Sequence, residues 1–232
     1  MAVAPTVFTK PDPKRLAVLR ECTENYGVGE PDAEWPNNLL SRRTVVTGGG
    51  AIRRAGEPIR HAVDPDELAL CRRLAAEVAG VMAGVPVGMG SESGDGFGDF
   101  FVVAEIDAAI PAGLDEALIR ARFGGTIFPL ATVSAEALTE AGGWWAEVEQ
   151  DGAGSGDDYL VPWRAMVGWF RGRPEFVATA FVRIGDGAAL GRTPRKKWPA
   201  GTETPGCVLP RLAVGLTRAG SLVGLFGHSV QT

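Results

Sequence analysis

Residues 208–217 read VLPRLAVGLT and residues 221–230 read SLVGLFGHSV, and these two segments give the clearest indication of the architecture. In both segments, odd-numbered and even-numbered residues would point to opposite faces of a sheet. Turn-forming Gly, Pro or Ser residues lie at the ends of the segments. Residues 160–170 (LVPWRAMVGWF) and 175–184 (EFVATAFVRI) have a similar apolar composition. The sequence therefore predicts an antiparallel β-meander over residues 159–232. Because both faces of these strands are largely apolar, we expect the sheet to be covered on both sides.

The turn between the last two segments predicts how they pair. If residues 219–220 form a two-residue hairpin turn, Gly215 lies opposite Gly224, and Arg211 lies opposite His228. The glycine pair would leave a strip of bare backbone on the sheet.

An aromatic ring such as that of Trp163 or Trp169 is expected to pack over this strip. The alternative is a close approach by another backbone or by a ligand, because glycine in a strand often marks such an approach.

The composition fits a single domain over residues 1–232. Of 232 residues, 45% are hydrophobic, which is enough for a substantial core. The 32 glycines and 16 prolines suit short strands joined by turns. We therefore predict an α+β fold, in which a mostly antiparallel sheet packs against two or three helices. The net charge of −5 argues against a surface built throughout for nucleic acid.

The helix predicted with most support spans residues 65–83. Asp64 can cap it, Pro65 fits its first turn, and Glu67 stands three residues after the cap, as in a capping box. Further helices are predicted at residues 14–24 and 114–121 and from an N-cap at Ser134, and further strands at residues 44–47, 58–63, 99–106 and 126–132. Residues 144–149 fit either a half-buried strand or a continued helix, and residues 1–13 an extended arm.

The cysteines indicate neither disulfides nor metal binding. The chain has three cysteines, which is an odd number, and no CxxC pair: Cys22, Cys71 and Cys207. Two histidines are too few for a histidine-rich metal site. No cofactor is predicted. Residues 1–10 lack the features of a signal peptide, and the apolar stretch at residues 74–89 is too short for a membrane span. We therefore expect a cytoplasmic protein of a bacterial type of cell.

Residues 84–98 form a glycine-rich loop. Its glycine spacing suggests a phosphate-binding loop, but it follows a helix and enters a strand, the reverse of the dinucleotide-binding order. Glu92, Asp95 and Asp99 could gather around calcium, although the terminal bidentate Glu of an EF-hand loop is missing. We expect a mobile loop or one that a partner orders, rather than a ligand loop.

Residues 185–207 connect two predicted strands and carry a basic cluster beside an aromatic residue. The cluster consists of Arg192, Arg195, Lys196, Lys197 and Trp198. Such a loop suits anions, including phosphates or a nucleic-acid backbone with a base stacked on the indole. The alternatives are a solvated loop and an arm that grips an acidic neighbouring subunit.

His228 is a weak catalytic candidate. The motif GHSVQ around it resembles a nucleophile elbow, but Gln231 replaces the expected glycine and no later triad member follows. We expect His228 to share a sheet face with Leu222 and Phe226 as a core histidine.

The long loops, the arm and the lack of a catalytic motif favour a non-catalytic interaction or assembly protein that contacts itself or partners. The first alternative is an enzyme or binder of anionic small molecules through residues 185–207, with His228 as acid or base. The second is nucleic-acid binding through the same loop. An anion site predicts a concave pocket joining that loop to His228, whereas an assembly protein predicts a large apolar surface.

Overall fold

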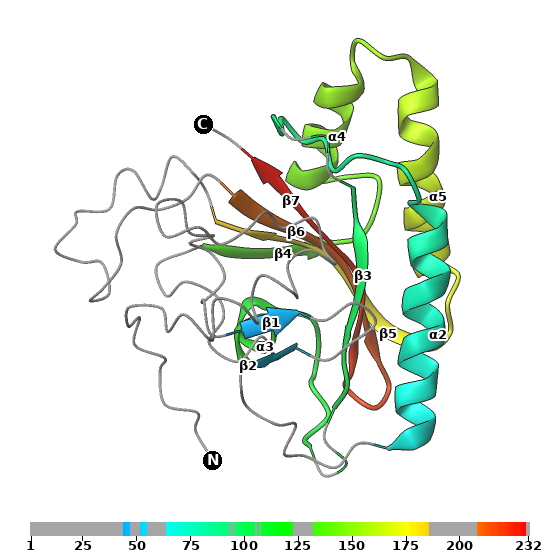
Figure 1. The fold of residues 1–232 in the computed structure, drawn as a ribbon, viewed down its shortest axis with the longest axis vertical. Helices are drawn as coiled ribbons and strands as arrows, with labels where there is room; N and C mark the ends of the chain where they lie inside the picture. Colours follow the sequence, from blue (N-terminus) through cyan, green and yellow to red (C-terminus); the bar gives the residue numbers. More distant parts are fainter. Residues whose placement is uncertain are drawn as a thin grey trace, which may run out of the picture.

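The computed structural model describes residues 44–46, 52–54, 64–92, 94, 96–104, 106, 108–122, 132–185 and 208–230. Its centre is a five-stranded sheet in the order β3-β7-β6-β5-β4, and every neighbouring pair is antiparallel (Figure 1). The strands are β3 (Gly98–Val102), β4 (Val133–Ala137), β5 (Phe176–Ile184), β6 (Val208–Thr217) and β7 (Leu222–Val230). β1 (Thr44–Val46) and β2 (Ile52–Arg54) pair in a separate two-stranded sheet. The predicted α+β class is confirmed.

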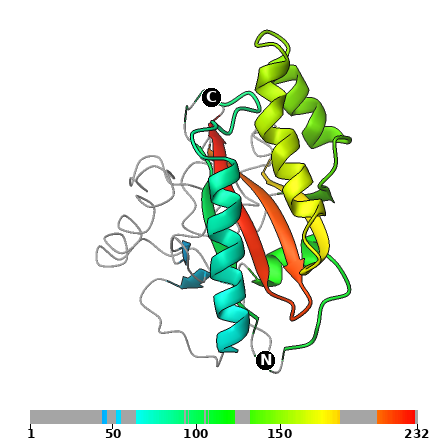
Figure 2. The same ribbon diagram turned by 90° about the vertical axis from the view of Figure 1, so that its right-hand side faces the viewer.

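The helices are α2 (Pro65–Val81), α3 (Glu116–Arg122), α4 (Gly143–Gly152) and α5 (Leu160–Arg171), and η1 (Asp157–Tyr159) is a short 3₁₀ turn. α2 and α5 run in front of β6 and β7 when that face is viewed directly (Figure 2). Within the described ranges, no helix combines the length and the apolar character that a bilayer crossing needs.

α2 begins with the predicted cap at Asp64, but Glu67 does not complete a capping box, because its carboxylate accepts from the Thr217 hydroxyl at 2.5 Å. The Asp64 carboxylate accepts a hydrogen bond from the Asp66 amide at 2.8 Å, and Pro65 occupies the first turn. The buried side chains of α2 recur at spacings of three and four and face the sheet: Cys71, Leu74, Ala75 and Val78. Burial raises the pKa of the Cys71 thiol to about 12, so it is neutral at physiological pH.

Residues 160–170 are the main error of the sequence analysis, because they form α5 instead of the first strand of the meander. The side chains that α5 buries are Trp163, Met166, Val167 and Phe170. This spacing places all four on one face of a helix, whereas in a strand they would divide between both faces. Aromatic and β-branched content suggested a strand, but the period of burial is helical.

Two shorter predictions are also resolved. Ser134 does not cap a helix, because it lies in β4 opposite Arg183 of β5. Residues 144–149 belong to α4, so the helical alternative holds for them. The predictions at residues 114–121 and 99–106 correspond to α3 and to a shorter β3, and that at residues 44–47 corresponds to β1. Those at residues 1–13, 14–24 and 58–63, and nearly all of 126–132, lie outside the described residues.

The hairpin between β6 and β7 differs from the predicted register by one residue. The Gly220 amide donates to the Thr217 carbonyl at 3.0 Å, and the Thr217 amide donates to the Ser221 carbonyl at 2.9 Å. Gly220 has φ +87°. These features make a three-residue loop with glycine in the left-handed region, instead of the two-residue turn. In consequence Gly227, and not His228, lies opposite Arg211.

The expected glycine pair is therefore absent, because Gly215 faces Val223 and Gly224 faces Val214. An aromatic ring does pack over Gly215, but it belongs to Phe176. A Cβ atom built on Gly215 would stand 2.5 Å from that ring. The packing interpretation holds at Gly215, although the ring there is neither Trp163 nor Trp169. At Gly224 the alternative holds, because a Cβ atom would stand 1.8 Å from the Ala213 carbonyl oxygen.

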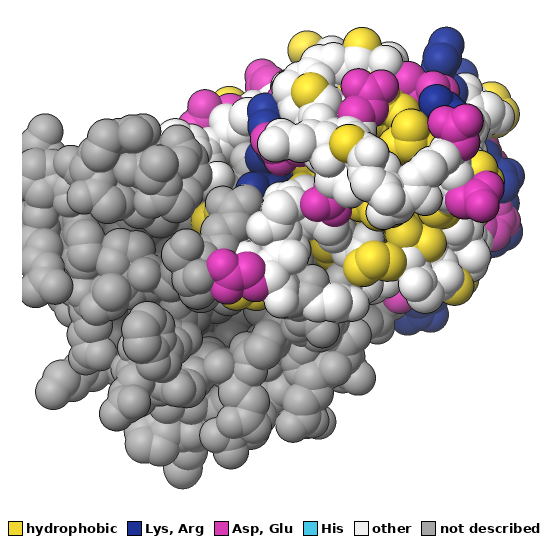
Figure 3. All heavy atoms as spheres, turned by 90° about the horizontal axis from the view of Figure 1, so that it is seen from above, with side chains coloured by type: hydrophobic (Ala, Val, Ile, Leu, Met, Phe, Trp, Pro, Cys, Tyr) yellow, Lys and Arg dark blue, Asp and Glu magenta, His cyan; other side chains and the backbone are white. Residues whose placement is uncertain are grey.

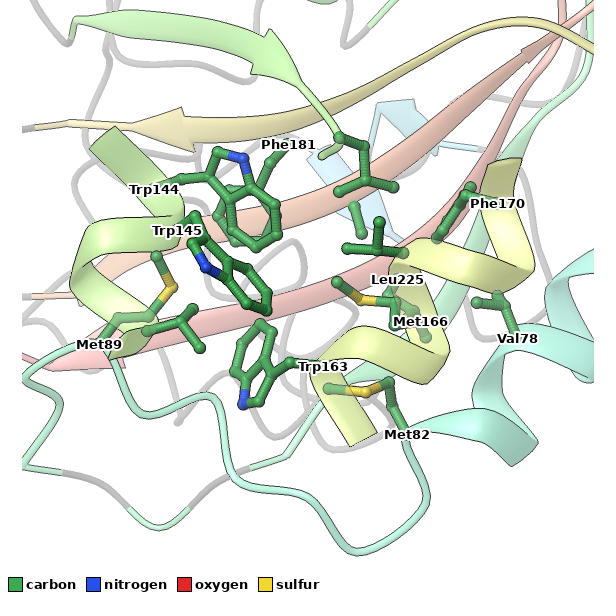
Figure 4. Close-up of a cluster of buried hydrophobic side chains, with 14 residues drawn as sticks. Val78, Met82, Met89, Trp144, Trp145, Trp163, Met166, Phe170, Phe181 and Leu225 are labelled. Atoms are coloured by element: carbon green, nitrogen blue, oxygen red, sulfur yellow. The ribbon is translucent and has the colours of Figure 1, made fainter. Parts of the chain in front are cut away.

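Both faces of the sheet are buried, as predicted. The face toward α2, α4 and α5 carries an aromatic cluster in which the indoles of Trp144, Trp145 and Trp163 lie between helices and strands (Figure 4). The Trp144 ring stacks on Phe181 with the ring centroids 4.5 Å apart. The opposite face packs with Ile119 of α3.

Candidate functional site

A cavity of about 740 Å³ lies where the ends of β4, β5 and β6 meet α4 and the loop of residues 84–98. Its lining combines acidic, basic and neutral polar groups. The lining residues are Met89, Gly90, Thr132, Ser134, Glu147, Gln150, Asp151, Arg183, Gly185, Leu209 and Arg211. On the described part of the face in Figure 3, acidic and basic side chains are likewise interspersed.

Arg183 connects three elements at this cavity. Its guanidinium donates to the carboxylates of Glu136 in β4 and Glu147 in α4. Burial alone would raise the pKa of Glu136, but the Gly143 amide, which donates to it at 2.8 Å, and Arg183 outweigh burial and lower that pKa. The cluster therefore attaches α4 to the edge of the sheet.

Arg211 lies directly opposite Arg183 in the β5–β6 register, on the same face of the sheet. Its side chain is buried, and Nη1 donates to the carbonyls of Pro210 at 3.0 Å and Ile184 at 3.4 Å. Like charges directly opposite on antiparallel strands repel each other. At Arg183 the carboxylates of Glu136 and Glu147 offset this repulsion.

Asp151 forms the other notable contact, at the end of α4. Its carboxylate accepts from the Met89 amide at 3.0 Å, from the Gly90 amide at 3.3 Å and from the Tyr159 hydroxyl at 2.7 Å. Gly88, Met89 and Gly90 all have positive φ, of 59°, 58° and 71°. Such a curled backbone can turn successive amides toward one anion, here the Asp151 carboxylate. Burial and then the bond to Asp151 raise the pKa of Tyr159.

Met89 and Gly90 of the loop at residues 84–98 line the cavity, and the prediction of a mobile or partner-ordered loop stays a prediction. The Glu92 amide donates to the Val230 carbonyl at 2.8 Å, and the Val230 amide donates to the Ser91 hydroxyl at 3.0 Å. Val87 and Phe97 lie over Gly227, within 2.5 and 2.9 Å of where its Cβ would stand. Contacts with its own chain hold the described part of this loop.

The two described acidic candidates of this loop, Glu92 and Asp99, lie at different places along β7. Asp99 lies in β3 opposite Leu225, Glu92 lies beside the end of β7, and Asp95 is outside the described residues. Among the residues that the structure describes, no group of three or more His, Cys, Asp or Glu side chains could hold a metal ion.

His228 is a core residue, as expected. It is 2% exposed. It lies on the sheet face that carries Leu222 and Phe226, and Arg211 lies on the other face of the sheet. It does not line the cavity. Among the described residues, the cavity therefore does not join residues 185–207 to His228, as an anion site was expected to do.

The basic cluster at Arg192, Arg195, Lys196, Lys197 and Trp198 lies outside the described residues. The described residues Gly185 and Leu209, close to the two ends of that segment, both line the cavity.

The charged residues that line the cavity have no role predicted from the sequence. Arg183 and Arg211 each stand within an apolar strand, where a charge needs a partner. This feature of the sequence could have indicated the site. Glu147 and Asp151 stand four residues apart and so share one face of α4. This shared face follows only if the segment is a helix, and the sequence left residues 144–149 open between strand and helix. No known family model matches this sequence, and no curated protein is significantly similar to it.

Proposed function

We propose that the protein binds a small polar molecule in the cavity between α4 and the ends of β4, β5 and β6. The observation that carries this proposal is the cavity itself, at about 740 Å³. Ligand pockets in proteins commonly measure about 300–1,000 Å³ and contain a few polar groups that orient the ligand. Here Arg183 and Arg211 provide donors, Glu147 provides an acceptor, and Ser134 and Gln150 provide both.

Among the described residues, the cavity is one feature that supports a binder. An anion site was expected to have a concave pocket joining residues 185–207 to His228. The cavity includes Gly185 and Leu209, close to the ends of that segment, but not His228. An assembly protein was expected to have a large apolar surface at its N-terminal arm and its long loops, and residues 1–13 and 186–207 lie outside the described residues. The strongly exposed large apolar side chains of the described residues are Ile106, Ile110, Val161 and Val177, which belong to three different segments. His228 is left out of the proposed site, so the proposal is of binding and not of catalysis.

Assembly and nucleic-acid binding stay separate proposals. Assembly would use residues 1–13, 84–98 and 185–207, and nucleic-acid binding would use residues 185–207. They require tests of their own, at the level of the whole molecule.

The test is to block the cavity at its exposed rim. Gln150 lines the cavity and is exposed, so Gln150→Trp should fill the entrance without disturbing the core. Val161→Trp is the matched control, because Val161 is 57% exposed on α5 and is not a lining residue. Thermal unfolding would be followed with a panel of amino acids, phosphorylated metabolites and nucleotides, because a ligand that binds the folded state raises the Tm.

We expect one class of compound to raise the Tm of the natural chain and of Val161→Trp, and to leave that of Gln150→Trp unchanged. An equal rise in all three proteins would place the ligand elsewhere. No rise with any compound of the panel would count against cavity binding.

A further inference from the structure

We draw no further inference here: the strongest candidate, the cavity between α4 and the ends of β4, β5 and β6, belongs to the site already described, and because Arg183 there already contacts Glu136 and Glu147, nothing in the described part of its lining selects one chemical class of ligand.

Discussion

Gly215 has no side chain, and the ring of Phe176 occupies the space beside it. A Cβ atom at Gly215 would stand 2.5 Å from that ring, which is closer than real Cβ atoms come to their neighbours. The ring is part of an aromatic group with Trp169 and Phe170, so it cannot move without disturbing two others. The absence of a single methyl group therefore decides how the start of β5 packs.

We expect Gly215→Ala to destabilise the fold by about 1–3 kcal/mol, as overpacking of a core does. The matched control is Gly80→Ala in α2, where a Cβ meets nothing within 4 Å and the position is exposed. That change should stabilise by about 0.5–1 kcal/mol because alanine favours a helix. Urea denaturation measures both, and equal effects of the two substitutions would contradict the packing argument.

The Glu136 carboxylate should make the free energy of unfolding depend on pH in the acidic range. Its folded pKa lies below the ordinary glutamate value, so the unfolded chain takes up the proton first as the pH falls. The stabilisation it provides is present above the ordinary pKa and is lost as the pH falls through the folded pKa. We expect Glu136→Gln to reduce the loss of stability between about pH 6 and pH 3.

Urea midpoints measured across that pH range test this expectation. Glu140→Gln is the control, because the ion pair of Glu140 with Arg164 is 47% exposed on both sides and solvent screens it. A pH profile that Glu136→Gln leaves unchanged would show that the carboxylate cluster does not contribute to acid sensitivity.

At the scale of elements, α5 shows how composition and periodicity can conflict. Its residues include Trp, Phe and Val, which are common in strands, and glycine and proline, which are uncommon inside helices. Pro162 lies in the first turn, where a missing amide costs little. Burial of one side against α4 and the sheet then outweighs the local preference.

The loop of residues 84–98 depends on Asp151 in the same non-local way. We expect Asp151→Ala to increase the hydrogen exchange of the Met89 and Gly90 amides by at least about 10-fold, because a hydrogen bond to a charged group contributes about 1.5–3 kcal/mol. Tyr159→Phe removes the hydroxyl bond but leaves the amide bonds, so its effect should be smaller.

The measurement is amide exchange by nuclear magnetic resonance, with amides of β6 and β7 as the internal reference. Faster exchange throughout the chain would indicate global destabilisation and contradict a local role. Unchanged exchange at Met89 and Gly90 would show that the carboxylate does not hold this loop.

At the scale of the whole molecule, the assembly proposal predicts a defined oligomer. Light scattering at low and moderate salt should then give one multiple of the chain mass at both. Combined alanine substitution of Arg192, Arg195, Lys196 and Lys197 should change that mass if the basic segment grips an acidic neighbour. A monomer under both conditions would contradict assembly and leave cavity binding and nucleic-acid binding as the remaining proposals.

The sequence by itself determined the elements whose signals are local. The N-cap at Asp64 and the stripe that follows it define α2, and the apolar runs bounded by turns define β5, β6 and β7. These predictions held because capping and side-chain alternation depend on residues a few positions apart. The burial of both sheet faces followed from the same pattern.

Tertiary structure alone decided the rest. The register of β6 and β7 changed by one residue, because the turn took a third residue with Gly220 in the left-handed region. The cavity required Arg183, Arg211 and Asp151 to meet from three separate elements, and no local spacing predicts such a meeting. Side-chain packing between distant segments, and not the preference of any one of them, places these charges together.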